Sequence, residues 1–228
     1  LSVANPEKAS FLQRFFKTGE GQYAEGDLFL GLVVPLTRSI AKANKNTPLS
    51  EIELLIQSKY HEARLCALLI LVEQFKKANE LQRGVLYDFY LNHIDYINNW
   101  DLVDISCPYI VGNYLLDKDH SRLYELAESK HLWSQRIAVV STIAFIRKGE
   151  FLDTFALAGK LLNHEHDLMH KAIGWMLREV GKKDRAALTD FLERNASLMP
   201  RTSLRYAIEH YPETERKAFL SVKQIKNK

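Results

Sequence analysis

The sequence predicts an all-α protein, a HEAT-like repeat α-solenoid, and three observations point to this fold class. Helix breakers are scarce, with ten Gly and six Pro in 228 residues, below an average usage of about 7% and 5%. Apolar residues recur at helical spacing over long stretches, most clearly from His61 to Phe75, and no alternating strand pattern competes with them. The third observation is an internal repeat of helix pairs, described below.

Proline and capping residues mark the first helices. Asn5, Pro6 and Glu7 combine a capping side chain, a proline at the first helical position and an acid in the first turn. The helix that follows carries Phe11, Leu12, Phe15 and Phe16, and we expect Gly19 and Gly21 to end it. Pro35 opens another helix, and Thr47 with Pro48 opens one that runs through Ile56.

Beyond residue 75 we expect helices in pairs with short connections. The pairs cover about 80–96 with 100–115, 119–129 with 132–148, and 151–162 with 166–181. Two more helices, about 185–194 and 201–210, precede a short basic tail over residues 221–228. Aligning the second helices places Arg64, Trp100, Arg136 and Ala172 in one register, with successive members 36 residues apart.

This period lies in the range of two-helix repeat proteins. No ankyrin or tetratricopeptide consensus is present, so the sequence favours a HEAT-like array, in which the second helices line a concave surface. We expect one domain over residues 1–228, with a basic concave cleft. The formal charge of +3 does not by itself identify a nucleic-acid-binding protein.

Cys66 and Cys107 lie in apolar helical patterns and are interpreted as core residues of a reducing compartment. No run of 18 apolar residues occurs, so we expect a soluble cytoplasmic protein that does not bind membranes. His166 and His170 have the spacing of a zinc pair on a helix. We favour the alternative of a polar loop leading into an N-capping Asp167, and expect no metal and no cofactor.

The repeat register collects unusual side chains on one helix face. Trp100 and Arg136 occupy position 0, Trp175 position +3 and Asp104 position +4, and these positions share a face. Two indoles, a carboxylate and a guanidinium are therefore expected on one inner stripe. The simpler interpretation of each residue is that a Trp is core and an acid in a first turn serves the helix dipole.

Four separated segments carry a resemblance to a known family. They are the Asn-Trp-Asp-Leu-Val-Asp run at 99–104, residues 132–136, residues 171–179, and Tyr23 with Phe29–Gly31. Together they resemble the AlkD-type alkylpurine DNA glycosylases. The resemblance implies a monomeric solenoid that binds double-stranded DNA and hydrolyses the glycosidic bond of cationic N3- and N7-alkylated purines.

The resemblance also implies roles for individual residues. Asp104 matches the catalytic carboxylate, and Trp100 and Trp175 match the aromatic pair that packs on the lesion deoxyribose. Arg136 matches a contact to the DNA backbone, and Tyr23 an N-terminal aromatic contact. The role of Asp101 stays open.

The chemistry agrees with these residue types. An alkylated purine is a cationic leaving group, and a carboxylate stabilises the oxocarbenium sugar that develops as it departs. No lysine lies on the stripe beside Asp104, so we expect no lyase step. Further phosphate contacts are expected from basic residues near the cleft: Arg38, Lys42, Lys171, Arg178, Arg201 and Arg205. The alternatives are a non-catalytic scaffold for branched or distorted DNA and a protein-interaction solenoid.

Overall fold

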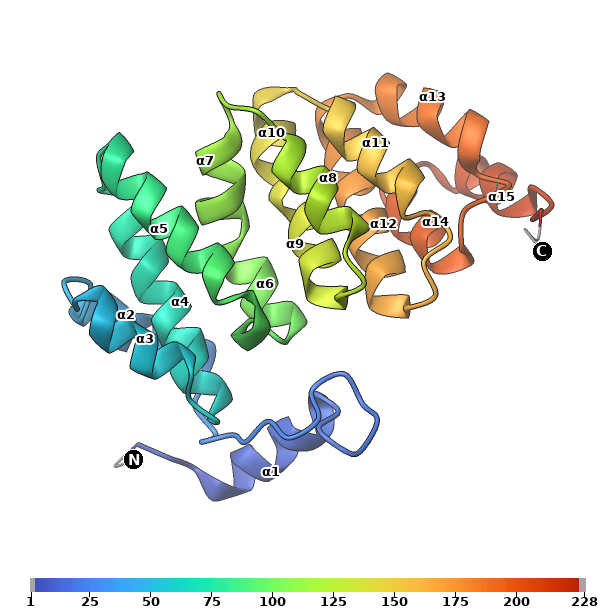
Figure 1. The fold of residues 1–228 in the computed structure, drawn as a ribbon. Coiled ribbons are helices and arrows are strands. Elements are labelled where there is room, and N and C mark those ends of the chain that lie inside the picture. Colours follow the sequence, from blue (N-terminus) through green and yellow to red (C-terminus); the bar gives the residue numbers. More distant parts are fainter. Residues whose placement is uncertain (1–2, 226–228) are drawn as a thin grey trace. The chain divides into compact units, whose positions relative to one another are not determined.

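The computed structural model describes residues 3–225, whose regular structure is helical apart from one isolated β-bridge between Leu28 and Tyr60. The chain divides into two compact units, Leu1–Ile110 and Val111–Lys228, whose helices are labelled in Figure 1. Each unit is described by itself. The predicted all-α class is confirmed.

The first unit is built around one long helix. Its elements are α1 (Pro6–Phe15), α2 (Val34–Ala43), α3 (Leu49–Ile56), α4 (His61–Phe75), α5 (Glu80–Asn92), a 3-10 turn (Ile94–Tyr96) and α6 (Trp100–Ser106). Helices α2, α3, α5 and α6 all pack on α4. Because α4 is covered on several sides, six consecutive residues, Ala67 to Val72, are buried, which explains why this part of its sequence is apolar all round.

The segment between α1 and α2 is held by a buried carboxylate. Glu62 on α4 accepts hydrogen bonds from the backbone N–H groups of Leu30, Gly31 and Leu32, at 2.9, 2.9 and 3.1 Å. Gly31 has a φ of +79°, and a Cβ there would lie 2.1 Å from the carbonyl oxygen of Asn5. Only glycine satisfies both the left-handed backbone and this close approach.

The second unit stacks helix pairs. Its helices are α7 (Asn113–Leu115), α8 (Ser121–Glu128), α9 (Leu132–Ser141), α10 (Ile143–Lys148), α11 (Leu152–Lys160), α12 (Asp167–Lys183), α13 (Arg185–Asn195), α14 (Arg201–Ala207) and α15 (Glu213–Ser221). Helix α12 contacts α9, α10, α11, α13 and α14. Gly174 allows α14 to approach, since a Cβ at this position would lie 2.5 Å from the carbonyl oxygen of Ser203.

The predicted helix starts agree with the structure, and the Asn5 side chain accepts a hydrogen bond from the backbone N–H of Lys8 at 3.0 Å. Three predicted helices are interrupted. The helix expected at about 80–96 ends at Asn92 and is followed by the 3-10 turn Ile94–Tyr96. The helix expected at 100–115 ends at Ser106 and continues as a π-helical turn, Pro108–Gly112, because proline lacks the N–H that an α-helix needs. The helix expected at 132–148 breaks at Thr142, whose hydroxyl donates to the Val139 carbonyl oxygen.

One helix was not predicted. Helix α15 follows Pro212, and Glu213 and Glu215 lie in its first turn, a start signal of the same kind as that of α1. The predicted basic tail begins at Ser221, the last residue of α15, and its residues 226–228 lie outside the described part of the chain. The single domain and the basic concave cleft stay predictions.

No helix in the described range 3–225 is both long enough and apolar enough to cross a lipid bilayer.

Candidate active site

Helix α6 presents Trp100 and Asp104 one turn apart, as the register predicts. The buried Asn99 precedes the helix in extended conformation, and its side-chain oxygen accepts a hydrogen bond from the backbone N–H of Trp100 at 2.8 Å. The side chains of Trp100 and Asp104 are half-buried. The start of α6 is therefore fixed by a cap, and two residues with candidate roles extend from its first turns.

The Trp100 indole packs against the N-terminal helix. It stacks on Phe16 with a centroid distance of 5.4 Å and an interplanar angle of 25°. Phe15, an exposed residue of α1, meets the same indole edge-on at 6.4 Å. The position of α1 therefore contributes to the orientation of Trp100.

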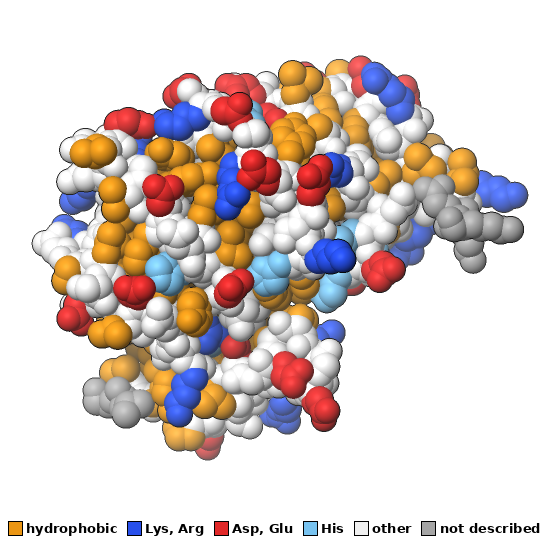
Figure 2. Space-filling view, in the orientation of Figure 1, with side chains coloured by type: hydrophobic (Ala, Val, Ile, Leu, Met, Phe, Trp, Pro, Cys, Tyr) orange, Lys and Arg blue, Asp and Glu red, His pale blue; other side chains and the backbone are white. Residues whose placement is uncertain are grey.

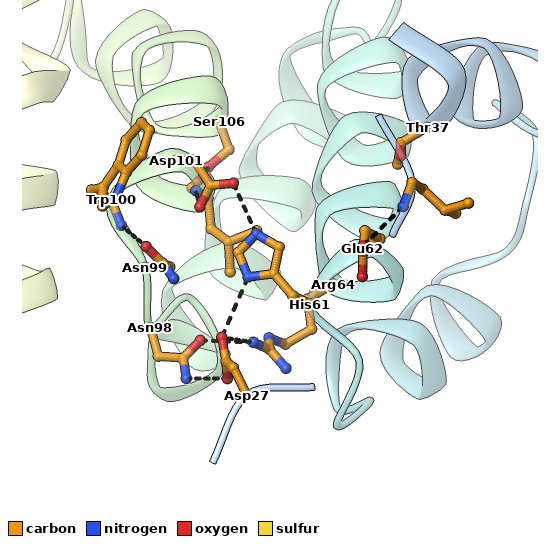
Figure 3. Close-up of polar contacts among 12 residues, drawn as sticks. Asp27, Thr37, His61, Glu62, Arg64, Asn98, Asn99, Trp100, Asp101 and Ser106 are labelled. Atoms are coloured by element: carbon orange, nitrogen blue, oxygen red, sulfur yellow. Dashed lines mark hydrogen bonds and ion pairs between the residues drawn. The ribbon is translucent and has the colours of Figure 1, made fainter. Parts of the chain in front are cut away.

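A cluster of charged and polar side chains lies at the base of α6 (Figure 3). The imidazole of His61 on α4 is within 2.8 Å of Asp101 Oδ2 through Nε2, and within 3.3 Å of Asp27 Oδ2 through Nδ1. Arg64 Nη2 lies 2.6 Å from Asp27 Oδ2, and the Asn98 side chain donates to Asp27 Oδ1 at 3.1 Å. We call these five residues the His61 cluster.

The charges of the His61 cluster balance. Burial alone would lower the pKa of His61, but the hydrogen bonds to Asp101 and Asp27 outweigh burial and raise its pKa to about 9. Burial alone would raise the pKa of Asp27, but the hydrogen bond to His61 and the charge of Arg64 together outweigh burial. The pKa of Asp27 therefore lies below its usual value. At neutral pH His61 is therefore an imidazolium beside the Asp27 carboxylate, and with Asp101 and Arg64 the formal charges of the cluster cancel.

The second unit holds two of the other predicted site residues. Trp175 is half-buried on α12, and its Nε1 donates to Glu179 Oε1 at 3.2 Å. Arg136 on α9 is 4% exposed, and its Nη1 donates to the carbonyl oxygen of Leu168 at 2.6 Å. Because these residues belong to another unit than Trp100 and Asp104, the common stripe stays a prediction.

The predicted phosphate contacts of the second unit lie on α12 and α14, which pack together. Lys171 pairs with Asp167 at 2.7 Å, and Arg178 pairs with Glu209. Arg201 donates to the carbonyl oxygens of Leu220 and Val222, at the end of α15.

The remaining predicted DNA contacts lie in three places. Arg205 is exposed on α14, Arg38 and Lys42 are exposed on α2, and Tyr23 is half-buried between α1 and α2. Cationic and anionic side chains alternate over the face shown in Figure 2 rather than forming one large basic area. The contribution of each residue to DNA binding stays a prediction.

The histidines at 164–170 organise a loop. His164 Nε2 lies 2.8 Å from Gln135 Oε1, and His164 Nδ1 accepts from the backbone N–H of His166. His166 itself caps α12 by accepting from the N–H of Leu168, so the expectation that Asp167 is the capping residue is wrong. Within residues 3–225 no group of three or more His, Cys, Asp or Glu side chains is arranged to hold a metal ion.

The His61 cluster was not predicted, although Asp101 was singled out as an acid without a role. A signal was present in the sequence, since His61, Glu62 and Arg64 begin an otherwise apolar helix. Charged groups are buried only when they are paired, so this start required buried partners. The identity of the partners was not evident, because Asp27 and Asn98 are separated by 71 residues.

Comparisons with known proteins agree with the fold. The family model of the DNA alkylation repair enzymes matches residues 1–211. A solved structure from Enterococcus faecalis, described as a predicted DNA alkylation repair enzyme, is similar with a TM-score of 0.70 and 17% sequence identity. The similarity covers 92% of this chain and 97% of that one. A comparison with curated proteins finds no match. On the family match, this chain belongs to the DNA alkylation repair enzymes.

Proposed function

We propose that this protein is a monofunctional DNA glycosylase that hydrolyses the N-glycosidic bond of cationic N3- and N7-alkylated purines in duplex DNA. The observation that carries the proposal is the presentation of Trp100 and Asp104 from the capped start of α6, in a chain of the DNA alkylation repair family. An indole beside a carboxylate suits a reaction in which positive charge develops on a sugar.

Asp104 is the proposed catalytic residue. Alkylation at N3 or N7 makes the purine a cation, so the base departs as a neutral molecule without protonation by an acid. As the glycosidic bond breaks, positive charge develops on the deoxyribose, and the Asp104 carboxylate stabilises it and directs a water molecule to C1′. Water supplies the hydroxyl group of the resulting abasic sugar, and its proton passes to solvent.

The aromatic and basic residues bind the substrate in this proposal. The faces of Trp100 and Trp175 attract the cationic sugar by about 0.5–2 kcal/mol each. Arg136 and Tyr23 contact the DNA near the lesion. Phosphate contacts come from the same basic residues that the sequence singled out: Arg38, Lys42, Lys171, Arg178, Arg201 and Arg205. The partner is double-stranded DNA with alkylated purines, bound by a monomer.

The test is release of methylated purines from methylated duplex DNA by the wild type and by Asp104→Asn. We expect the variant to lose at least about 100-fold in single-turnover rate, the loss typical of a removed electrostatic contact to the transition state, while its affinity for DNA is retained. Asp95→Asn is the matched control, because Asp95 is an exposed acid of the same unit, in the 3-10 turn before α6.

Two outcomes would contradict the proposal. Binding of the duplex without release of any base by the wild type would identify a scaffold for branched or distorted DNA instead. Trapping of a covalent DNA adduct with borohydride would contradict the monofunctional mechanism, because it requires an amine nucleophile.

A further inference from the structure

We propose that the His61 cluster is a positioning device for the reaction: His61, acting through Asp101 and Phe16, holds Trp100 and Asp104 in the reactive geometry. This inference rests on the proposed glycosylase function. It assigns a role to residues that the family resemblance left without one, and each contact that supports it lies within the first unit.

The first connection is a carboxylate shared between two helices. Asp101 follows Trp100 directly, in the first turn of α6. Its Oδ1 accepts from the backbone N–H of Leu102 at 2.9 Å, while its Oδ2 accepts from His61 Nε2 at 2.8 Å. One side chain therefore fixes the start of α6 relative to α4, and Asp104 lies on the next turn of the helix so fixed.

The second connection is a series of stacked rings. His61 stacks on Phe29 at 4.7 Å and lies against Phe16 at 5.0 Å. Phe16 in turn stacks on Trp100 at 5.4 Å. A cation between aromatic faces is attracted to both, so the charged imidazole supports the ring that orients the Trp100 indole.

The balance of charge makes the arrangement sensitive to change. His61 is 2% exposed and Asp27 is 5% exposed, so the loss of one charge leaves its partner buried and uncompensated. A cavity of about 330 Å³ lies beside the cluster and is lined in part by Phe15, Phe16, Phe29, His61 and Asp101. Because space is available on this side, the rings and the start of α6 can shift when His61 is replaced.

A purely stabilising role does not explain this composition. Replacing a buried ion cluster by well-packed apolar residues is often neutral or stabilising, and α4 already buries an apolar surface toward four helices. The ion cluster adds orientation, since each of its hydrogen bonds is directional and fixes the position of one side-chain atom. The hydrogen bonds of the cluster meet at the turn of α6 that carries Trp100.

The test compares His61→Gln with His120→Gln. His120 provides a matched control in the second unit: it pairs with Asp153 at 2.8 Å, bonds the Leu115 carbonyl oxygen at 2.9 Å and stacks on Phe145 at 4.5 Å. For His61→Gln we expect a fall of about 10- to 100-fold in single-turnover excision rate at saturating protein, with the Kd for the duplex within about threefold. For His120→Gln we expect an excision rate within about twofold of the wild type.

The pH dependence of the excision rate distinguishes a positioning role of His61 from a role in fold stability alone. The charged side chains that act on His61 are Asp27, Arg64 of α4 and Asp101 of α6. Lys8 of α1 and Glu62 of α4 line the same cavity as His61. The wild-type rate should fall as pH rises through about 9, where His61 loses its proton. In Asp101→Asn the amide oxygen still accepts from Nε2, but the pKa of His61 is lower, so the fall should begin at lower pH.

Several results would overturn the inference. They are a folded His61→Gln that excises at the wild-type rate, equal losses in His61→Gln and His120→Gln, or coincident pH profiles for Asp101→Asn and the wild type. If His61→Gln does not fold, the Asp101→Asn profile decides.

A readout independent of excision separates this inference from the proposed function. In a chain with Trp133→Phe and Trp175→Phe, Trp100 is the remaining tryptophan of the three, and acrylamide quenching of its fluorescence reports its packing. We expect stronger quenching when His61→Gln is added. Unchanged quenching would contradict positioning. If His61→Gln does change the quenching but the wild-type protein releases no base, only the glycosylase function is contradicted.

Discussion

Arg64 in the first unit and Arg136 in the second occupy the same register position, two repeats or 72 residues apart, and both are buried. Arg64 donates to the Ser58 carbonyl oxygen at 2.8 Å, to Asn98 Oδ1 at 3.1 Å and to the Asp27 carboxylate. Arg136 donates to the Leu168 carbonyl oxygen. Each arginine thus reaches about one repeat ahead in the sequence, to residues just before or at the start of a following second helix.

The difference between the two arginines shows what the first unit adds to the repeat. A link from a guanidinium to a neutral acceptor joins neighbouring repeats in both units. Around Arg64 the structure places the Asp27–His61–Asp101 series of charges, and this series leads to the helix that carries Trp100 and Asp104. The hydrogen bond from a buried arginine to the next repeat is common to both units, and in the first unit this arginine is also part of the His61 cluster.

The largest effect that tests this comparison is expected from Arg64→Gln. The substitution leaves a buried carboxylate without its guanidinium, and we expect the free energy of unfolding to fall by about 3–5 kcal/mol. Denaturant unfolding measures the loss. Arg122→Gln is the control, because Arg122 forms an exposed pair with Glu125 on one helix and its loss should cost less than about 1 kcal/mol. Equal losses for the two variants would remove the distinction between the buried joint and a surface pair.

The next effect is the pH dependence of stability. Because the pKa of His61 is raised to about 9 in the folded chain from an unfolded value of about 6.5, its contribution is fully present below about pH 6.5. The contribution is lost progressively as pH rises through about 9 and should total about 3 kcal/mol. Urea unfolding of the wild type and His61→Gln between pH 6 and 9.5 measures it. Parallel pH curves for the two proteins would show that His61 is not the titrating group.

The smallest effect concerns Arg136. Its substitution by Gln leaves the Leu168 carbonyl oxygen without this donor, and we expect a loss of about 1–3 kcal/mol in unfolding free energy. Arg205→Gln, on an exposed face of α14, should change stability by less than about 0.5 kcal/mol.

The same two variants test the proposed phosphate contacts. Each contact that is lost should reduce the slope of log K against log salt by about one. A slope that falls in Arg205→Gln but not in Arg136→Gln would show that Arg136 joins repeats without touching DNA.

Much of the fold could be predicted because its signals are local. Capping residues and prolines gave the starts of α1 and α2, and an unbroken apolar pattern gave α4. The interruptions at Pro108 and Thr142 were missed because the apolar period continues through both sites. Helix α15 was missed because it buries none of its residues and carries few apolar side chains, so that only the start signal at Pro212 marks it.

The candidate site divides in the same way. Trp100 and Asp104 could be placed on one helix face from their spacing, and α6 confirms that placement. Asp101 was noticed, but its partner His61 is 40 residues away, and no local pattern links the two. Pairings of this kind depend on how α4 and α6 pack, which a single sequence does not encode at short range.

The carboxylate of Glu62 has a consequence for the dynamics of the N-terminal region. Loop amides ordinarily exchange their hydrogens with solvent rapidly, since brief local openings expose them. The amides of Leu30, Gly31 and Leu32 donate to a side chain buried on α4, so exchange requires that this part of the first unit open. These amides should therefore exchange as slowly as those of the central helix, and the stretch that connects α1 to α2 opens and closes with the core of its unit.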